Sequence, residues 1–284
     1  MVEEHRIDCP AAAHAPVAED NAVAISAAQA EHRRILAFII EAGKTLLENG
    51  AEVFRVEQTM QHIAKSYDLP SFQVYVITNG IFVSAGGAQL AELRNVASRG
   101  VHLGRVAAIN ALSRQIAAGD LTIEQADLAL AQAIAMPSIT AKTRVLASAF
   151  GSFSFCFLFG GGFLDALVSL CAGAALGGYL YWCETRKVEN LFQRLSGAAL
   201  VAAFCVAAVL MFATLSIDTS AAIIGAFMIL TPGVAFTMAI RDFVRADYLS
   251  GTIRMIDAVL VATSIAIGAG LVLWLGQLLT GGAI

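Results

Sequence analysis

The stretch VLASAFGSFSFCFLFGGGFL at residues 145–164 has no charged side chain, and four further charge-poor stretches follow it. The hydrocarbon core of a bilayer is about 30 Å thick and requires about 20 helical residues. In lipid every backbone N–H and C=O must be hydrogen-bonded within the segment, so such stretches fold as helices. The sequence therefore predicts a membrane domain at residues 141–284 with five transmembrane helices, at about 145–164, 166–183, 196–217, 219–240 and 257–279.

The composition of the whole chain agrees with this prediction. Hydrophobic residues make up 58% of the 284 residues, charged residues only 14%, and the mean hydropathy is +0.72. A soluble domain carries about 25% charged residues. The net charge of −4 gives no reason to expect nucleic acid, and the cysteines and histidines show no metal-ligand spacing. We expect a mainly α-helical integral membrane protein in the lipid bilayer, without metal or cofactor.

Positively charged residues alternate between the connections of the predicted spans. The basic connections hold Arg186, Lys187 and Arg194 after the second span, and Arg241, Arg245 and Arg254 after the fourth. The first and third connections and the C-terminal tail have no Lys or Arg. Basic loops face the cytoplasm. The pattern predicts that the N-terminus and the polar half of the chain are cytoplasmic, and that the C-terminus is outside.

The polar half is predicted to form an α+β head domain at residues 27–140, after a disordered tail at residues 1–26 that has few large apolar side chains. Apolar residues at helical spacing, alternating residues before Asn79-Gly80, and a capping-box pattern at Thr122–Gln125 indicate its elements. The expected elements are helices at about 27–49, 53–67, 101–118 and 123–136, and a β-hairpin around Asn79-Gly80.

Charged residues cluster early in the head. Glu48, Glu52 and Arg55 share a helical face if the break at Asn49-Gly50 is mild, and Glu57 follows. One interpretation is a binding or gating motif made of Glu52, Arg55 and Glu57. The other is a solvated helix with ion pairs along its surface, which the spacing alone favours. The head shows no nucleophile–base pair and no phosphate-binding loop, so we do not expect an enzyme.

The fourth predicted span contains Thr231, Pro232 and Gly233 near its middle. Proline cannot donate to the carbonyl four residues earlier, and glycine permits unusual backbone angles. A half-helix that begins here would present N–H groups and a positive dipole end, which suit a carboxylate. Transporters often bind substrate at such interrupted helices. The alternative is an ordinary proline kink.

Ionisable residues at the span ends are the second group of candidates. Arg241 and Asp242 mark the cytoplasmic end of the fourth span, and Asp257 begins the fifth. Arg241 could attract an anionic substrate, while Asp242 or Asp257 could carry a proton. The alternative is that Arg241 only sets topology and that the aspartates are solvated. For Asp165, Asp218 and Asp247 we expect solvated loop positions. Gly173 and Gly177 form a GxxxG step that we expect to pack within the chain.

Two stretches carry a family resemblance: EAGKTLLENGAEVFRVE at 41–57, and LTPGVAFTMAIRD at 230–242 continued by RADYLSG at 245–251. Together they resemble the bacterial threonine/serine exporter family, and most closely its split form, in which a YjjP-like subunit works with a smaller YjjB-like membrane partner. The resemblance covers roughly residues 30–280. It implies a bacterial inner-membrane exporter whose second half is a separate YjjB-like subunit.

The resemblance also implies the substrate class. For the split form a dicarboxylate such as succinate is favoured, and threonine or serine comes next. The substrate-binding or gating residues would be Thr231, Pro232, Gly233, Arg241, Asp242 and Asp257. Two alternatives stay open: a membrane-anchored cytoplasmic enzyme or sensor, and a homo-oligomeric channel that needs no partner. Five spans are few for enclosing a pathway, so we expect a hetero- or homo-oligomer.

Overall fold

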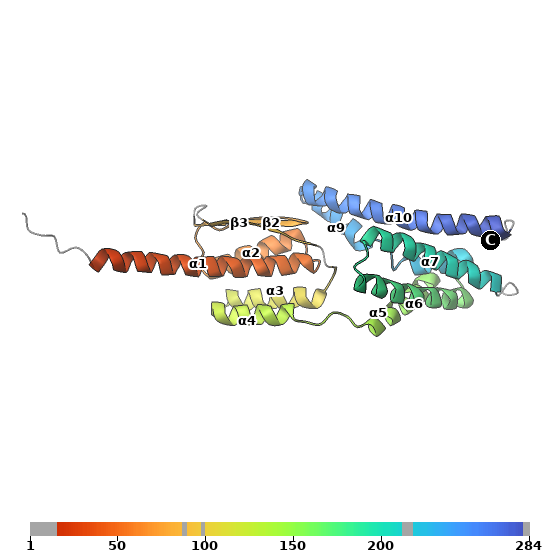
Figure 1. Ribbon diagram of the computed structural model, residues 1–284, viewed down its shortest axis with the longest axis horizontal. Coiled ribbons are helices and arrows are strands. Elements are labelled where there is room, and N and C mark those ends of the chain that lie inside the picture. The colour runs from red at the N-terminus through yellow and green to blue at the C-terminus, as the bar shows by residue number, and fades with distance from the viewer. Residues whose placement is uncertain (1–15, 87–89, 98–99, 212–217, 281–284) are drawn as a thin grey trace, which may run out of the picture. The chain divides into compact units, whose positions relative to one another are not determined.

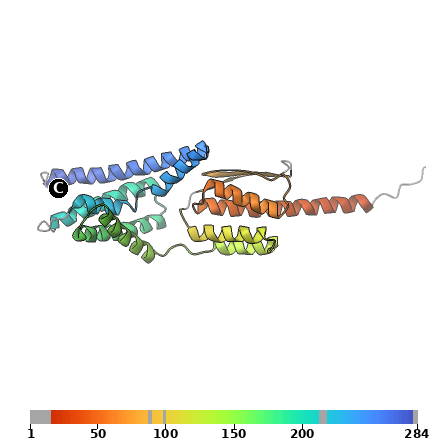
Figure 2. The same ribbon diagram turned by 180° about the vertical axis from the view of Figure 1, so that it is seen from behind.

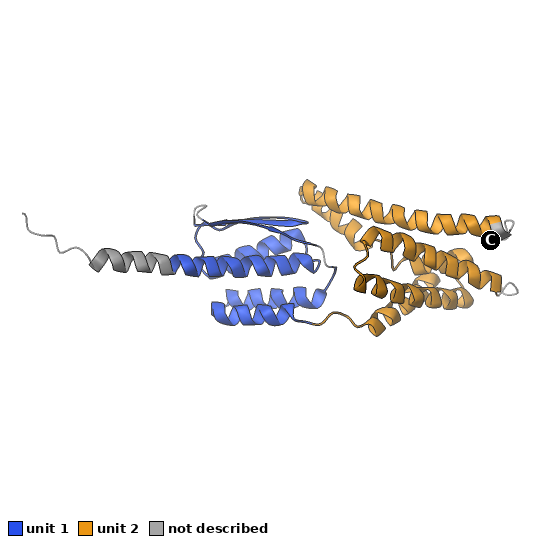
Figure 3. Ribbon diagram, viewed as in Figure 1, with its two compact units in different colours: residues 1–136 blue, residues 137–284 orange. Residues whose placement is uncertain are grey.

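The computed structural model describes residues 16–86, 90–97, 100–211 and 218–280. The chain divides into two compact units, Met1–Met136 and Pro137–Ile284 (Figure 3). The described elements of the first unit are α1 (Pro16–Glu48), α2 (Val53–Ser66), β1 (Gln73–Ile77), β2 (Gly80–Ala85), β3 (Leu90–Asn95), α3 (Leu103–Ala117) and α4 (Ile123–Ile134). Those of the second are α5 (Ala141–Leu158), α6 (Phe163–Thr185), α7 (Asn190–Met211), α8 (Thr219–Phe227), α9 (Gly233–Val244) and α10 (Tyr248–Thr280).

The first unit has three layers (Figures 1 and 2). The antiparallel sheet β1-β2-β3 covers one side of the α1–α2 pair, and α3 and α4 pack on the other side. The middle layer is buried because its apolar side chains are contacted from both sides. The largest fully buried side chains of this core are Leu36, Ile39, Leu46, Met60, Ile63, Ile81 and Ile109.

Helix α1 begins at Pro16, inside the segment for which composition predicts disorder. Proline suits the first position of a helix because its missing N–H would have no partner there, and alanine has the highest helix propensity. The Ala-rich part of that segment is therefore compatible with a helix. The rest of the predicted tail, residues 1–15, lies outside the described residues.

A sharp turn separates α1 from α2. Gly50 has φ +85°, which closes the end of α1, and the N–H of Ala51 donates to the carbonyl of Leu46 at 3.0 Å. The break at Asn49-Gly50 is therefore not mild. The sequence argument that placed Glu48, Glu52 and Arg55 on one continuous helical face is wrong, because α2 runs back along α1 as a separate helix.

The predicted hairpin is confirmed. Ile77 pairs with Gly80, which leaves Thr78 and Asn79 as the two turn residues. Neither has positive φ, so this is not the mirror-image turn that an Asn-Gly pair favours. The third strand, β3, is an addition that sequence reasoning missed. Its side chains are mostly exposed, so it lacks the apolar alternation that marks a half-buried strand.

The second unit is a bundle of apolar helices. Three of its described helices are long and apolar enough to cross a membrane: Phe163–Thr185, Asn190–Met211 and the Tyr248–Leu278 part of α10. The expected number of five is not confirmed. Gly160, with φ +88°, ends the first expected span early, and the first turn of α5 carries Lys142 and Arg144. The fourth expected span is divided into α8 and α9, and each is too short to cross alone.

Helices α5 and α6 pack closely through small residues. A Cβ at Gly173 would lie 2.6 Å from the Cβ of Ser152 and 2.7 Å from the carbonyl oxygen of Ser148, and a Cβ at Gly177 would lie 2.9 Å from the Cβ of Ser148. The hydroxyl of Ser169 also donates to the carbonyl of Ser152 at 3.1 Å. The GxxxG step therefore packs within the chain, as the sequence analysis expected.

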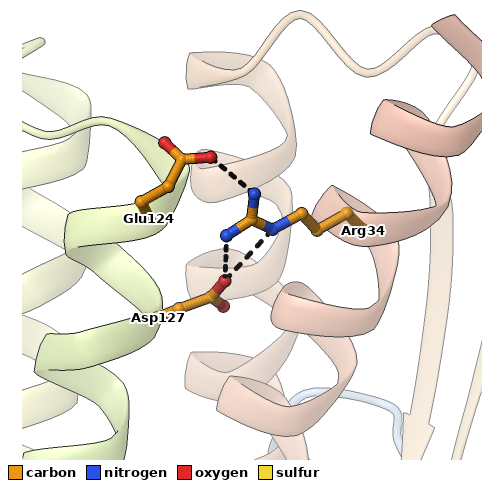
Figure 4. A network of polar contacts seen from close by, with 3 residues as sticks. All are labelled: Arg34, Glu124 and Asp127. Carbon is orange, nitrogen blue, oxygen red and sulfur yellow. Dashed lines mark hydrogen bonds and ion pairs between the residues drawn. The ribbon is translucent and has the colours of Figure 1, made fainter. Parts of the chain in front are cut away.

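An ion-pair network joins α1 to α4 in the first unit (Figure 4). The guanidinium of Arg34 contacts Glu124 at 2.5 Å and Asp127 at 3.0 Å. Hydrogen bonds to its own backbone N–H and to Thr122, together with Arg34, hold the pKa of the Glu124 carboxyl below its usual range. All three side chains are well exposed, so the network contributes little stability and mainly sets how the two helices align.

The α5–α6 contact gives the first prediction. Gly173→Ala should destabilise the second unit by about 1–3 kcal/mol, because the new methyl group overlaps backbone and side-chain atoms of α5. Gly178→Ala on the same helix is the control, since its Cβ would lie 4.0 Å from Val145. Thermal unfolding of both variants in detergent measures the difference. Equal melting temperatures for the two would contradict this packing.

The Arg34 network gives a second prediction, on pH. Because the pKa of Glu124 is lowered in the folded state, its contribution to stability is present above the unfolded pKa of glutamate, about 4.3. That contribution is lost as the pH falls through the folded pKa. Glu124→Gln should therefore unfold more readily than the wild type at neutral pH, and the difference should shrink in acid. Chemical unfolding at several pH values measures it, and a pH-independent difference would refute the assignment.

Candidate functional site

The most unusual backbone of the second unit lies between α8 and α9. Helix α8 ends at Phe227, α9 begins at Gly233, and residues 228–232 connect them without regular helix. The carbonyl of Phe227 accepts from the N–H of Leu230 at 2.8 Å and from the N–H of Thr231 at 3.0 Å. Pro232 is the N-cap of α9. The sequence "TPG" therefore interrupts the helix and does not merely kink it.

The interruption leaves backbone amides free. In α9 the N–H of Gly233 donates to Thr231 at 2.9 Å, and that of Phe236 donates to Pro232 at 3.0 Å. The N–H groups of Val234 and Ala235 have no acceptor among the described residues. A cluster of free amides at a helix N-terminus, where the helix dipole is positive, is suited to an anion.

The other residues of the break leave this end of α9 open. Thr231 points its hydroxyl back to the carbonyl of Phe227 at 3.0 Å and is therefore occupied. No heavy atom lies within 4 Å of the position of a Cβ on Gly233, and its φ is not positive. Gly233 is therefore not required by backbone strain, contrary to the sequence argument. Its effect is to keep the first turn of α9 accessible.

Arg194 of α7 lies at the same break. Its Nη1 donates to the carbonyl of Leu230 at 3.4 Å, and its Nε donates to the side chain of Asn190 at 3.3 Å. Leu230 itself is buried against α7, near Gly197. Sequence reasoning used Arg194 only to set topology. The sequence analysis began the third span at residue 196, whereas α7 begins at Asn190 and so includes Arg194.

Asp242 and Arg254 form an ion pair that joins α9 to α10. Their Oδ2 and Nε atoms are 3.3 Å apart, and the two side chains are only 12% and 13% exposed. Next to them Gly251 packs so closely on α9 that a Cβ would lie 2.7 Å from the ring of Phe243. Asp242 thus anchors α9 on α10. This gives the residue a structural partner that the sequence did not identify.

The remaining predicted site residues are more scattered. Arg241 is exposed on α9, and Asp257 is exposed on α10. No described contact joins Asp257 to the break or to the Asp242–Arg254 pair. Of the six membrane candidates, the structure brings together Thr231, Pro232 and Gly233. It places Asp242 and Arg241 on the helix that follows them.

Asp165 differs from its expected solvated position. It is 6% exposed, and its carboxylate accepts the N–H of Gly162 and the N–H of Asp218, both at 2.8 Å. Asp218 in turn accepts from Ser220 and Ala221 at the start of α8. A buried carboxylate is retained because backbone donors satisfy it. Asp165 therefore fastens the start of α8 to the start of α6.

The head motif lies in the first unit. Glu52 is the N-cap residue of α2, and Arg55 is exposed on its first turn. The carboxylate of Glu57 accepts the backbone N–H of Val76 at 2.8 Å and so connects α2 to β1. This hydrogen bond between α2 and β1 gives the Glu57 carboxylate a structural role. Among the described residues no group of three His, Cys, Asp or Glu side chains could hold a metal ion.

The apolar helices of the second unit define this chain as a membrane protein. The family model ThrE, described as "Putative threonine/serine exporter", matches residues 37–276. The chain therefore belongs to the threonine/serine exporter family, as its motifs indicated. Comparison with curated proteins and with solved structures gives no match.

The Asp242–Arg254 pair gives a third prediction. Asp242→Asn and Arg254→Gln should each destabilise the second unit, because each removes the partly buried ion pair between α9 and α10. The double variant should lose less stability than the sum of the losses in the two single variants. The expected coupling free energy, measured by thermal unfolding, is about 0.5–3 kcal/mol. The Arg144–Glu184 pair, which is more exposed than the Asp242–Arg254 pair, is the control and should show weaker coupling. Additive losses for Asp242 and Arg254 would show that the pair does not hold α9.

Proposed function

We propose that this chain is the membrane subunit of an exporter of small carboxylate metabolites, with the substrate carboxylate bound at the break between α8 and α9. The observation that carries the proposal is the pair of free amides, Val234 and Ala235, at the start of α9. In apolar surroundings an unsatisfied N–H costs free energy, so a bound anion would offset that cost. Membership of an exporter family supports the same function.

The chemistry of the break favours some substrates over others. Each candidate, whether succinate, threonine or serine, offers a carboxylate to the amides of α9. An amino acid also brings an ammonium group, which an acidic side chain would bind most strongly. No acidic side chain is hydrogen-bonded or ion-paired to residues 228–232 within the described chain. We therefore place a dicarboxylate such as succinate first, and threonine or serine second.

The proposal includes five membrane passes. Helices α6, α7 and α10 are long enough alone, and α5 and the α8–α9 pair would supply the other two. The basic residues after α6 and after α9 then face the cytoplasm of a bacterial inner membrane, with the N-terminal unit on that side and the C-terminus outside. Interrupted helices are tolerated in membranes where they border a cavity or protein, which agrees with a substrate path.

A YjjB-like small membrane subunit is the proposed partner. Within the described chain, α9 packs mainly on α10, and its side chains Val234, Phe236, Ile240 and Val244 are exposed. These side chains leave room for a neighbouring helix beside the break. A homo-oligomer of this chain is the second candidate, since the same exposed side chains could meet another copy.

The deciding experiment measures efflux of preloaded succinate, threonine and serine from cells that lack their own exporters. The cells carry this chain, a YjjB-like partner, or both. We expect succinate efflux only with both. Efflux with this chain alone would replace the two-component exporter with a homo-oligomer. If none of the solutes leaves cells that contain both proteins in the membrane, the proposed function is wrong.

A variant at the break gives the fourth prediction. Pro232→Ala allows the helix to continue, which removes the free amides of α9 and should lower efflux about tenfold or more. Leu278→Ala, at an exposed position far along α10, is the control and should leave efflux unchanged. Arg241→Ala should also lower efflux if this cation attracts the substrate. Immunoblots of the membrane fraction check that all variants are inserted equally. Normal efflux in Pro232→Ala would show that the break between α8 and α9 does not bind the substrate.

A further inference from the structure

Arg194 is a partly buried cation of the membrane unit. Its two hydrogen bonds go to the amide oxygen of Asn190 and to the carbonyl of Leu230. An arginine has five N–H donors, so its Nη2 group and part of Nη1 have no acceptor in the described part of the chain. Glu184 interacts with it electrostatically, but no carboxylate of a described residue lies within ion-pair distance of it. Glu184 is paired with Arg144 at 2.6 Å, and Asp242 with Arg254.

The charge of Arg194 is compensated only in part, because Glu184, a carboxylate that interacts with it electrostatically, is itself ion-paired with Arg144. Ionisable groups inside membrane proteins usually serve substrates, ions or one another. The residue is also aimed at the break between α8 and α9, since its guanidinium reaches the carbonyl of Leu230 directly before Thr231 and Pro232. The free donors of Arg194 and the free amides of α9 therefore belong to the same interrupted segment.

We propose that Arg194 binds the second carboxylate of a dicarboxylate substrate while the amides of Val234 and Ala235 bind the first. The inference rests on the proposed function and adds its specificity residue. Guanidinium recognises a carboxylate strongly because it offers parallel charged donors. The same charge repels the ammonium group of threonine or serine. Arg194 thus selects dicarboxylates over amino acids of similar size.

The alternative role for Arg194 is purely structural. A cation near the C-terminal end of α8 would stabilise that helix through its exposed carbonyls, whatever the substrate. The two roles differ in one observable. A structural residue affects every transported solute equally, whereas a substrate-binding residue affects only the solute that carries the second negative charge.

The experiment compares succinate with its half-amide, succinamate, which has nearly the same shape and one carboxylate. Efflux of both is measured in cells that carry this chain and its YjjB-like partner. The wild type should prefer succinate by about tenfold, the effect of one charged contact. Arg194→Gln should lower succinate efflux about tenfold and change succinamate efflux by less than about twofold, so that the preference disappears.

Two further variants complete the test. Arg194→Lys retains the positive charge and should keep part of the preference for succinate. Arg186→Gln removes a charge from the same connection, where the guanidinium of Arg186 lies over the ring of Trp182 at 6.0 Å. This variant should change the efflux of neither solute. Membrane levels of all variants are measured by immunoblot.

Each outcome decides between the roles. If Arg194→Gln lowers the efflux of both solutes by the same factor, the role of Arg194 is structural and the inference is overturned. If the wild type exports both solutes equally, the inference is also overturned, while the carboxylate exporter stands. If the wild type exports neither solute, the proposed function itself fails and the inference fails with it.

Discussion

The need to satisfy backbone polar groups in apolar surroundings governs the membrane unit. In α5, α6, α7 and α10 the helix itself meets that need. Between Phe227 and Gly233 it is met only in part, because Pro232 cannot continue the ladder. The carbonyl of Phe227 is satisfied by neighbouring residues, and that of Leu230 by Arg194. The amides of Val234 and Ala235 are the donors left over, and the proposed function follows from them.

The rest of the unit holds this break in place from both sides. Asp165 fastens the start of α8 to α6, and Gly225 of α8 lies against Ser169 and Cys156. On the other side, the Asp242–Arg254 pair and Gly251 fasten α9 to α10. Two half-helices with separate anchors can present a fixed gap between them. A continuous helix with the same sequence length would present none.

The sequence predicted much of this arrangement, because its strongest signals are local. The charge-poor stretches gave the apolar helices, and Pro232 marked the interruption. The GxxxG step at Gly173 and Gly177 gave the α5–α6 contact. The strand β3 was missed because its exposed residues carry no period. Three of the five expected spans are described helices long enough to cross a membrane, and the other two are shortened or divided at Gly160 and Pro232, which a count of uncharged residues does not register.

The partners of the site were beyond sequence reasoning for a different reason. Arg194 and Leu230, Asp242 and Arg254, and Asp165 and Asp218 meet only after the chain has folded, so no spacing along the sequence relates them. The same holds in the head, where Glu57 bonds to Val76 of β1 rather than to a helical neighbour. Charged residues that looked solvated in a loop or on a helix therefore became structural.

The proposed contact between the amides at the start of α9 and the substrate carboxylate can be observed directly. Solid-state NMR of the reconstituted protein tests it directly, with ¹⁵N at the backbone of Val234 and Ala235 and ¹³C at the carboxylates of succinate. We expect dipolar transfer between these nuclei that corresponds to hydrogen-bond contact, and loss of that transfer in Pro232→Ala. Bound succinate without any transfer to these two amides, in protein that exports succinate, would contradict it.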